Sequence, residues 1–312
     1  MAAAGGGNAA RVGQREYDVD ADAVVIGHND EDAMSEGTHE DTSSSRTASG
    51  IASIESGGTK RVIITGASSG LGRALAVHYA ESGWTVGAIA RRADLLEELA
   101  KEYRGRIVAM AADVTDGDAT EQAIHRFNLE EGGLDLIYVN AGIGQSSPEE
   151  GWDAYRARRI AEVNVVGATN TIAPAATIMV EQGHGRIVGI SSLAGWVALP
   201  SSAAYGASKA WMVFYLRSLD MDLRDAGVRC SVVMPGYIAT PMVDVDLDAK
   251  NLSQGVKRAA VHIANRVARG DGMIRFPRRV AMLSRLGVFL PSSMRMRMQR
   301  KRLAKRKQLR SG

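Results

Sequence analysis

A glycine-rich segment at residues 65–72, Thr-Gly-Ala-Ser-Ser-Gly-Leu-Gly, constrains the fold of this chain more than any other feature. Residues 61–64 before it predict a short buried strand, and residues 73–82 after it predict a helix. Gly66 permits a tight turn, and the two later glycines allow a ligand and the helix to approach the backbone closely. Amides at the start of the helix then face a negative group. The segment predicts a dinucleotide phosphate site, with a purely structural turn as the alternative.

Strands and helices alternate along the middle of the chain. One helix is expected at residues 203–226. The alternation predicts an α/β fold with a doubly wound parallel sheet of the Rossmann type and helices on both faces. The 312 residues, 45% of them hydrophobic, suffice for one large α/β domain or two small ones. Strands are predicted at residues 61–65, 84–90, 106–111, 134–139, 186–191, 228–234 and 272–276.

Tyr205 and Lys209 are the first candidate for chemistry. Their spacing of four residues puts both side chains on one face of the predicted helix. A free tyrosine keeps its proton to about pH 10, whereas a nearby ammonium favours the phenolate and lowers that pKa. The pair is therefore a candidate proton donor near neutral pH. The alternative is a half-exposed helix with a packed ring and a solvated lysine.

These two motifs together resemble the short-chain dehydrogenase/reductase family, whose glycine pattern is Thr-Gly-x-x-x-Gly-x-Gly. Further segments typical of that family follow in the same order, and the resemblance covers about residues 60–277. It implies an oxidoreductase that carries a nicotinamide cofactor. The matching segments are Asp113-Val114-Thr115 after the third predicted strand, Asn140-Ala141-Gly142 after the fourth, Asn164 on a long predicted helix, Ile190-Ser191-Ser192 at the end of the fifth strand, and Pro235-Gly236 with Thr240 after the sixth.

The resemblance implies a role for each residue of a catalytic tetrad. Tyr205 gives its proton to a carbonyl oxygen or takes one from an alcohol, while Lys209 lowers the tyrosine pKa and binds the nicotinamide ribose. Ser192 holds the substrate oxygen, and is chosen over Ser191 because family members place this serine thirteen residues before the tyrosine. Asn164 holds a water that links Lys209 to solvent. Alternatives remain: Asn164 as a helix kink or a satisfied core group, and Ser192 as a turn or cap residue.

The end of the second predicted strand indicates which cofactor is bound. Ala90 stands where NAD-binding members usually have an acid, and Arg91 and Arg92 follow. A guanidinium forms a forked pair with a 2′-phosphate, so we predict NADP(H) rather than NAD(H). Arg91 is expected to be the main contact, supported by Arg92 or Ser68; the alternative is that both arginines begin a solvated helix. The other implied cofactor contacts are Gly66, Ser69, Gly70, Leu71, Gly72, Asp113, Val114, Asn140, Ala141, Gly142, Tyr205, Lys209, Pro235, Gly236, Ile238 and Thr240.

The substrate is less constrained than the cofactor. Residues 241–270 are expected to form a mobile lid, and the acids at 244–248 lack the spacing of a metal site, so no metal is predicted. Cys230 lies in an apolar strand and is expected in the core. Mostly apolar candidate pocket residues favour a hydrophobic ketone, aldehyde or secondary alcohol: Ile143, Gly144, Trp152, Leu193, Trp196, Leu199, Tyr237 and Met242.

The two ends of the chain differ from its middle. Residues 1–59 are acidic and low in apolar content, which predicts a disordered tail without the features of a signal or transit peptide. Residues 278–312 form a basic extension, expected to be partly helical and solvated. Contact with a membrane surface is the second interpretation of this extension, and nucleic-acid binding is disfavoured because no recognised motif accompanies the charge. We expect a cytoplasmic protein.

Two hypotheses of different classes follow. The first is an NADP(H)-dependent oxidoreductase acting on an apolar carbonyl or alcohol, and the second is a non-catalytic NADP(H)-binding sensor or scaffold. The presence of all four tetrad residues favours the enzyme. The resemblance also implies a homodimer through the helices that carry Asn164 and Tyr205. Residues 275–277 replace the glycine-rich close of many members, which argues against a tetramer.

Overall fold

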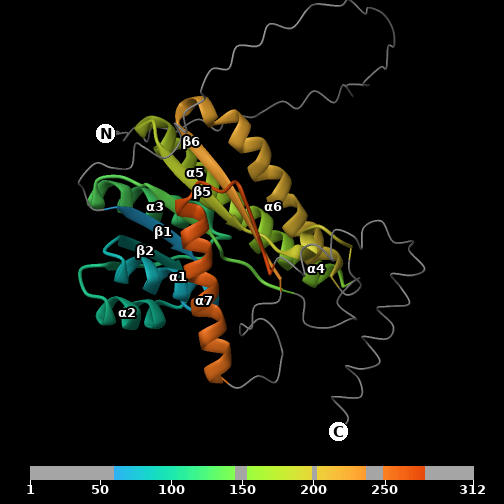
Figure 1. Ribbon diagram of the computed structural model, residues 1–312, viewed down its shortest axis with the longest axis horizontal. Coiled ribbons are helices and arrows are strands. Elements are labelled where there is room, and N and C mark those ends of the chain that lie inside the picture. The colour runs from blue at the N-terminus through green and yellow to red at the C-terminus, as the bar shows by residue number, and fades with distance from the viewer. Residues whose placement is uncertain (1–59, 145–152, 199–201, 237–248, 278–312) are drawn as a thin grey trace, which may run out of the picture. The chain divides into compact units, whose positions relative to one another are not determined.

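A seven-stranded parallel sheet with the order β3-β2-β1-β4-β5-β6-β7 forms the centre of the protein in a computed structural model (Figure 1). The structure describes residues 60–144, 153–198, 202–236 and 249–277. The predicted doubly wound sheet is confirmed, and each predicted strand lies within two residues of its expected bounds. The strands are β1 Arg61–Thr65, β2 Thr85–Ala90, β3 Ile107–Ala111, β4 Leu136–Val139, β5 Gly185–Ile190, β6 Val228–Pro235 and β7 Met273–Phe276.

Helices cover both faces of the sheet because successive strand residues point to opposite sides. In β1, Val62 and Ile64 face the core shared with α1, α2 and α7, whereas Ile63 faces the core shared with α3, α5 and α6. The chain reverses direction across the sheet between β1 and β4, where ligands bind in folds of this kind. The helices are α1 Gly70–Glu81, α2 Ala93–Glu102, α3 Gly117–Glu131, α4 Ala154–Ala161, α5 Gly167–Gln182, α6 Ala203–Asp222 and α7 Ala249–Ala268.

The lid predicted at residues 241–270 is wrong for most of its length. Residues 249–268 form α7, which packs against α1 (Figure 1). Val256, Ala260, Ile263 and Val267 recur at helical spacing and are buried in that contact. The apolar stripe of α7 therefore belongs to the core, and α7 cannot swing away without exposing it.

One helical run has the length and hydropathy of a membrane span: within the described segments only Ala154–Gln182 passes this test, and 56% of its most apolar window is buried inside the fold. The run comprises α4, a π-turn and α5. Ile172 and Met179 of α5 are fully buried against the sheet, so packing accounts for the apolar sequence.

Several predictions fall outside the described residues. These are the tail at 1–59, the extension at 278–312, the first part of the lid at 241–248, the cofactor contacts Ile238 and Thr240, and the pocket residues Trp152, Leu199, Tyr237 and Met242.

Candidate active site

The glycine-rich turn is held against the end of β4 by three hydrogen bonds. The Thr65 hydroxyl oxygen accepts from the backbone amides of Asn140 at 3.0 Å and Ala141 at 3.1 Å, and the Asn140 side chain donates to the Thr65 carbonyl at 2.8 Å. Gly66 has a φ of +69°, which favours glycine. A Cβ on Gly72 would lie 2.3 Å from the Gly66 carbonyl oxygen, so a side chain there would force the turn and helix apart. The predicted phosphate loop and the fourth strand end thus form one unit.

Arg92, which follows β2, lies over this turn. Its guanidinium donates to the Ser68 hydroxyl at 3.2 and 2.8 Å and to the Ser69 hydroxyl at 2.7 Å. All three side chains are polar, and Arg92 is solvent-exposed. The described residues give Arg92 no carboxylate partner, so its charge is met only by neutral hydroxyls. This cluster has the chemistry to receive a phosphate.

Arg91 points to a different neighbour. Its guanidinium lies 3.7 Å from the Asp113 carboxylate, which also accepts from the Thr115 amide at 3.0 Å and the Thr115 hydroxyl at 2.9 Å. Burial alone would raise the pKa of Asp113, but the hydrogen bonds from Thr115 and the charge of Arg91 hold it below its ordinary value. The Val114 carbonyl accepts from Asn170 on α5 at 2.9 Å. The segment after β3 is thereby fixed beside the turn.

Asn164 lies in a π-turn, Glu162–Val166, that interrupts the helical run between α4 and α5. Its side chain is 1% exposed and is bonded to the backbone after β4, accepting from the Ile143 amide at 2.8 Å and donating to the Ile143 carbonyl at 3.0 Å. It also donates to the Ser208 hydroxyl at 3.0 Å. π-turns are rare and are frequent at functional sites. The two alternatives considered for Asn164, a helix kink and a satisfied core polar group, are both observed, although the sequence did not predict a π-helical turn.

Lys209 lies on α6 one turn after Tyr205 and is 6% exposed. Its ammonium donates to the Ile190 carbonyl at 2.9 Å and lies 5.8 Å from the centre of the Tyr205 ring. Burial lowers the pKa of Lys209 to about 8. A Cβ on Gly142 would lie 3.3 Å from this ammonium and 3.1 Å from the Asn164 side-chain oxygen. The lysine, the asparagine and the end of β4 therefore meet at Gly142.

The two serines after β5 have different surroundings. Ser191 is 2% exposed, and its hydroxyl donates to the Lys209 carbonyl at 2.7 Å. Ser192 is partly exposed, and its oxygen accepts from the Ala194 amide at 3.1 Å, which caps the short 3₁₀ turn Leu193–Gly195. The predicted cap role of Ser192 is therefore observed, while its hydroxyl proton makes no bond among the described residues. The buried Ser191 hydroxyl therefore has a structural role, because its proton is already bonded to the Lys209 carbonyl.

Among the predicted pocket residues, Leu193 is buried and Trp196 is partly exposed. The Arg275 guanidinium lies 4.0 Å from the centre of the Trp196 ring, a cation–π contact that the sequence did not predict. The Gly236 amide donates to the Phe276 carbonyl at 2.7 Å and ties the ends of β6 and β7 together. The part of the site near the ends of β6 and β7 therefore includes a charged side chain, Arg275, among its apolar residues.

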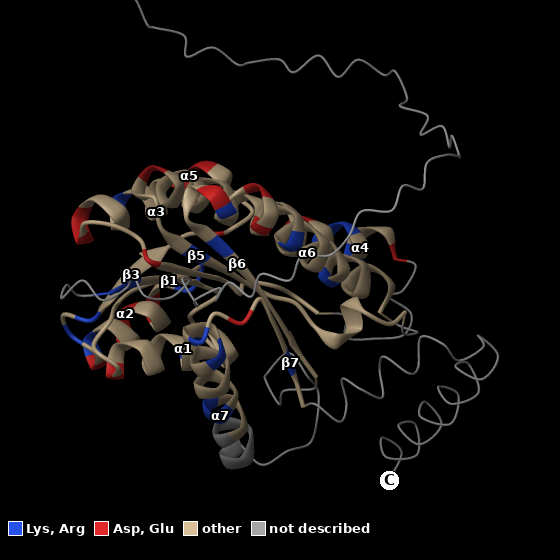
Figure 2. Cartoon of the chain, turned by 45° about the horizontal axis from the view of Figure 1, so that its top comes forward, with Lys and Arg blue, Asp and Glu red and all other residues tan. Residues whose placement is uncertain are grey.

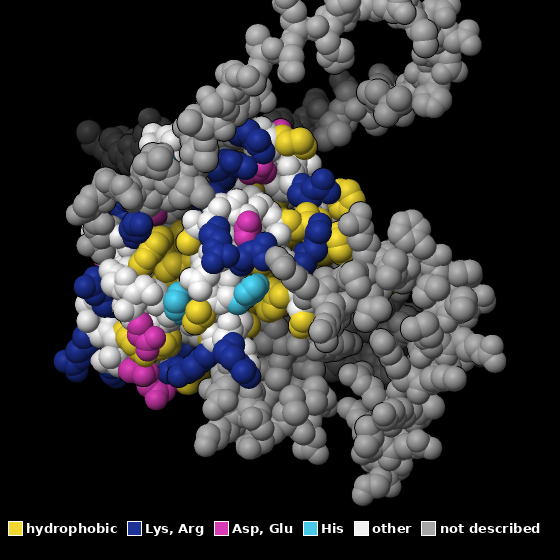
Figure 3. Space-filling view, in the orientation of Figure 1, with side chains coloured by type: hydrophobic (Ala, Val, Ile, Leu, Met, Phe, Trp, Pro, Cys, Tyr) yellow, Lys and Arg dark blue, Asp and Glu magenta, His cyan; other side chains and the backbone are white. Residues whose placement is uncertain are grey.

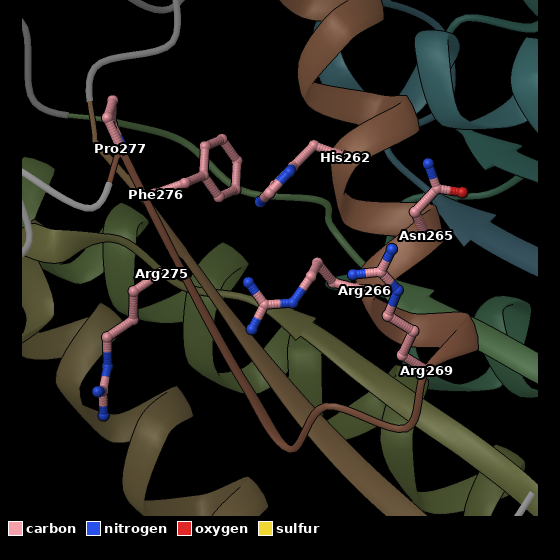
Figure 4. Close-up of a pocket in the computed structure, with 7 residues that line it drawn as sticks. All are labelled: His262, Asn265, Arg266, Arg269, Arg275, Phe276 and Pro277. Atoms are coloured by element: carbon pink, nitrogen blue, oxygen red, sulfur yellow. The ribbon is translucent and has the colours of Figure 1, made fainter.

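A hollow that the sequence did not predict lies between α7 and the end of β7 (Figure 4). Its volume is about 540 Å³. Tyr205 and Lys209 do not line it, so it is separate from the site above. The lining residues are His262, Asn265, Arg266, Arg269, Arg275, Phe276 and Pro277.

The fold and this constellation of residues define an oxidoreductase that uses a nicotinamide cofactor and interconverts carbonyl and alcohol groups. The family model described as short chain dehydrogenase matches residues 60–251. The chain belongs to the short-chain dehydrogenase/reductase family.

Individual relatives support the same assignment. The chain is 36% identical to an uncharacterized oxidoreductase of Myxococcus xanthus over 236 residues, covering 75% of this chain and 93% of the relative. It is 32% identical to a 3-oxoacyl-(acyl-carrier-protein) reductase of Thermotoga maritima over 193 residues, covering 59% and 76%. A solved 3-ketoacyl-(acyl-carrier-protein) reductase of Brucella melitensis, complexed with NADH, aligns with a TM-score of 0.63 at 25% identity, covering 70% of this chain and 96% of that one.

Proposed function

We propose that this protein is an NADP(H)-dependent oxidoreductase that interconverts a carbonyl and an alcohol on a mostly apolar substrate, with Tyr205 as the group that transfers the proton. The observation that carries the proposal is the environment of Lys209. Its buried ammonium has no carboxylate partner in the described part of the chain and lies one helical turn from Tyr205. A cation in this position favours the phenolate and lowers the tyrosine pKa.

The other residues have complementary tasks. When bound, the cofactor supplies or accepts the hydride. Tyr205 gives its proton to the substrate oxygen during reduction, and the free hydroxyl proton of Ser192 holds that oxygen in place. Both amide hydrogens of Asn164 are used by Ile143 and Ser208, so a water held at Asn164 must donate to an oxygen there. That water returns a proton toward Lys209.

The preference for NADP(H) rests on Arg92 and its two serines. The expected main contact was Arg91, but Arg91 faces Asp113, whereas Arg92 faces only the hydroxyls of Ser68 and Ser69. We therefore assign the 2′-phosphate to Arg92, with Arg91 in a supporting role. The Brucella melitensis structure holds NADH, so the preference is to be tested on this chain itself.

Cofactor affinity tests this assignment. Arg92→Ala should weaken NADPH binding on the order of 10- to 100-fold, because a hydrogen bond to a charged group contributes roughly 1.5–3 kcal/mol. NADH binding should change little, and Arg91→Ala should have the smaller effect on NADPH. Equal affinity of the wild type for NADPH and NADH would refute the preference.

Turnover separates the enzyme from a non-catalytic NADP(H)-binding sensor or scaffold. The purified protein should oxidise NADPH with some apolar ketone or aldehyde. Tight NADPH binding without turnover across a broad carbonyl panel would favour the sensor or scaffold.

Exposed apolar side chains support a homodimer. Phe214 and Met221 on α6 are 70% and 69% exposed, and Tyr155 on α4 is 72% exposed. Exposed apolar clusters of this kind mark interaction surfaces. Phe214→Asp should shift the protein toward monomer in sedimentation velocity, with Arg104→Asp, an exposed position in the turn after α2, as the control. We retain the cytoplasmic location and the boundaries 1–59, 60–277 and 278–312 as parts of this proposal.

A further inference from the structure

The hollow between α7 and β7 is lined by cations and closed by an apolar wall. Four of its seven lining residues are arginine or histidine and none is acidic, although the guanidinium of one of them, Arg275, lies against Trp196. The rings of His262 and Phe276 are in T-shaped contact, with 5.0 Å between their centres, and Figure 4 shows the two side chains next to each other. Pro277 continues the apolar side. Such a lining suits a molecule that is anionic at one end and apolar at the other.

The positive charge of α7 is poorly compensated. The helix Ala249–Ala268 contains no Asp or Glu, and Figure 2 shows its basic residues in blue along the described part of the helix, while Figure 3 shows basic side chains gathered on this face of the molecule. Arg266 contacts Asp271. Among the described residues, Arg258 and Arg269 have no carboxylate partner, and both are exposed. Arg258, Arg266 and Arg269 lie at helical spacing on the side of α7 that carries His262, so the three guanidinium charges add on one face.

Strand geometry separates this hollow from the catalytic residues. Ile274 and Phe276 point toward α7, whereas Arg275 points to the opposite face and stacks on Trp196. Figure 4 shows the Arg275 side chain directed away from His262 and Phe276. Tyr205 and Lys209 belong to α6, which covers that opposite face. We propose that the hollow is a second binding site, for a small organic oxyanion whose phosphate or carboxylate pairs with Arg269 and whose apolar part packs on Phe276.

Calorimetry on the full chain tests this site with octyl phosphate, inorganic phosphate and vesicles that contain phosphatidic acid. NADP⁺ is kept saturating so that phosphate does not report on Arg92. Octyl phosphate should bind, more tightly than inorganic phosphate, and Arg269→Gln should weaken it at least about 10-fold because a charged hydrogen-bond pair is lost. The matched control is Arg104→Gln, an exposed arginine in a turn after α2, which should bind like the wild type.

Three results would overturn the site: octyl phosphate binding that Arg269→Gln does not weaken, equal weakening by Arg104→Gln, or binding to vesicles alone. The last would assign the charge to a membrane surface. Calorimetry measures binding and not NADPH turnover, so a failure of this proposal can be distinguished from a failure of the proposed activity.

An independent observation concerns Ser208, which lies between Tyr205 and Lys209 and is 4% exposed. Its hydroxyl donates to the Tyr205 carbonyl at 2.8 Å and accepts from the Asn164 side chain at 3.0 Å. The Ser208 hydroxyl thus links the Asn164 side chain in the π-turn to the Tyr205 carbonyl in α6. We infer that Ser208 is a positioning residue, which holds the Asn164 side chain beside Tyr205 and Lys209 through these two hydrogen bonds. This inference rests on the proposed function.

The test is the pH profile of turnover. Ser208→Ala should lower kcat about 10-fold and move the pH limb assigned to Tyr205, with the KM for NADPH unchanged, and Ser208→Thr should restore part of the rate because it keeps the hydroxyl. Ser231→Ala removes another buried hydroxyl, one bonded to Arg186 away from the site, and should alter stability only. A Ser208→Ala enzyme with a lowered Tm but wild-type kcat and pH profile would refute the role. An inactive wild type would instead count against the proposed function.

Discussion

The two ends of the parallel sheet differ in whether their charged side chains are paired with opposite charges. At the amino end, Arg61 donates to Asp135 through its side chain at 2.9 Å and through its backbone amide at 2.8 Å. Asp220 accepts from Arg229 at 3.0 Å and from the Cys230 amide at 2.8 Å. Burial alone would raise the pKa of both carboxyls, but these hydrogen bonds hold them below the ordinary value. These charges are satisfied within the protein.

At the carboxyl end, Arg91 lies 3.7 Å from Asp113, but Lys209 and Arg92 have no carboxylate partner among the described residues. The Lys209 ammonium is bonded to a backbone carbonyl, and the Arg92 guanidinium is bonded to the hydroxyls of Ser68 and Ser69. A buried or clustered cation of this kind costs stability in the absence of a ligand. The paired charges at the amino end stabilise the fold, whereas Lys209 and Arg92 at the carboxyl end are available to an anionic or polar ligand, as the proposed function requires.

The largest expected effect is at Tyr205. Tyr205→Phe should lower kcat by roughly 10²- to 10⁴-fold, the usual contribution of a positioned general acid, while NADPH affinity stays within about twofold. Stopped-flow turnover and fluorescence titration measure the two quantities. Substantial turnover by this variant would show that the carboxyl end does not use Tyr205 for proton transfer.

Lys209→Met should stabilise the protein without cofactor and should lower kcat by less than Tyr205→Phe does. Folding lowers the pKa of Lys209 from 10.5 to about 8, so below pH 8 the folded state bears the full cost of a buried ammonium, about 3 kcal/mol. Between pH 8 and 10.5 the unfolded state binds more protons, and this cost is relieved as the pH rises. The difference in unfolding free energy between the variant and the wild type should therefore shrink across that window in urea titrations.

The difference in unfolding free energy between Lys209→Met and the wild type reports on Lys209 alone. Burial raises the pKa of Cys230 to about 12, which makes the fold less stable above the ordinary thiol pKa of 9.0, but this contribution is present in both chains and cancels. A difference that does not change between pH 8 and 10.5 would mean that Lys209 is not a buried, uncompensated cation.

Asp220→Asn tests the amino end. It should lower the free energy of unfolding by about 1–3 kcal/mol, because Arg229 and the Cys230 amide lose a charged acceptor, and kcat per folded molecule should not change. Because the folded-state pKa of Asp220 is depressed, the stabilisation it supplies should disappear as the pH falls below its ordinary value of 3.8. Denaturant titration of both chains at several pH values measures this. A loss of kcat in this variant would contradict the conclusion that the charges at the amino end contribute only to stability.

The smallest expected effect is at Gly142. A methyl group there would lie 3.1 Å from the Asn164 oxygen and 3.3 Å from the Lys209 ammonium, so either neighbour must move by a few tenths of an ångström. Gly142→Ala should lower kcat several-fold with little change in Tm. Gly105→Ala changes a glycine with no atom near its Cβ, and its activity should match the wild type, although its φ of +72° makes that turn less stable.

Much of this protein was predictable from the sequence because the signals are local. Alternating strand and helix patterns gave the order and bounds of the seven strands, and the Tyr205–Lys209 spacing placed both side chains on one face of α6. The glycine-rich segment needed only its neighbours to predict a turn. Each of these inferences depends on residues within about one helix or strand of each other.

Tertiary structure decided what depends on distant contacts. The π-turn at Asn164 is held by Ile143, which is 21 residues away, and its link to α6 crosses 44 residues through Ser208. Residues 249–268 form a core helix rather than a lid because their apolar stripe meets α1. The two arginines after β2 are adjacent in the sequence, but Arg92 meets Ser68 and Arg91 meets Asp113. The sequence by itself determined the seven strands and where they end. The π-turn, the packing of α7 and the side chains that the strand-end residues meet depended on packing across the sheet, because such contacts join segments that no local pattern connects.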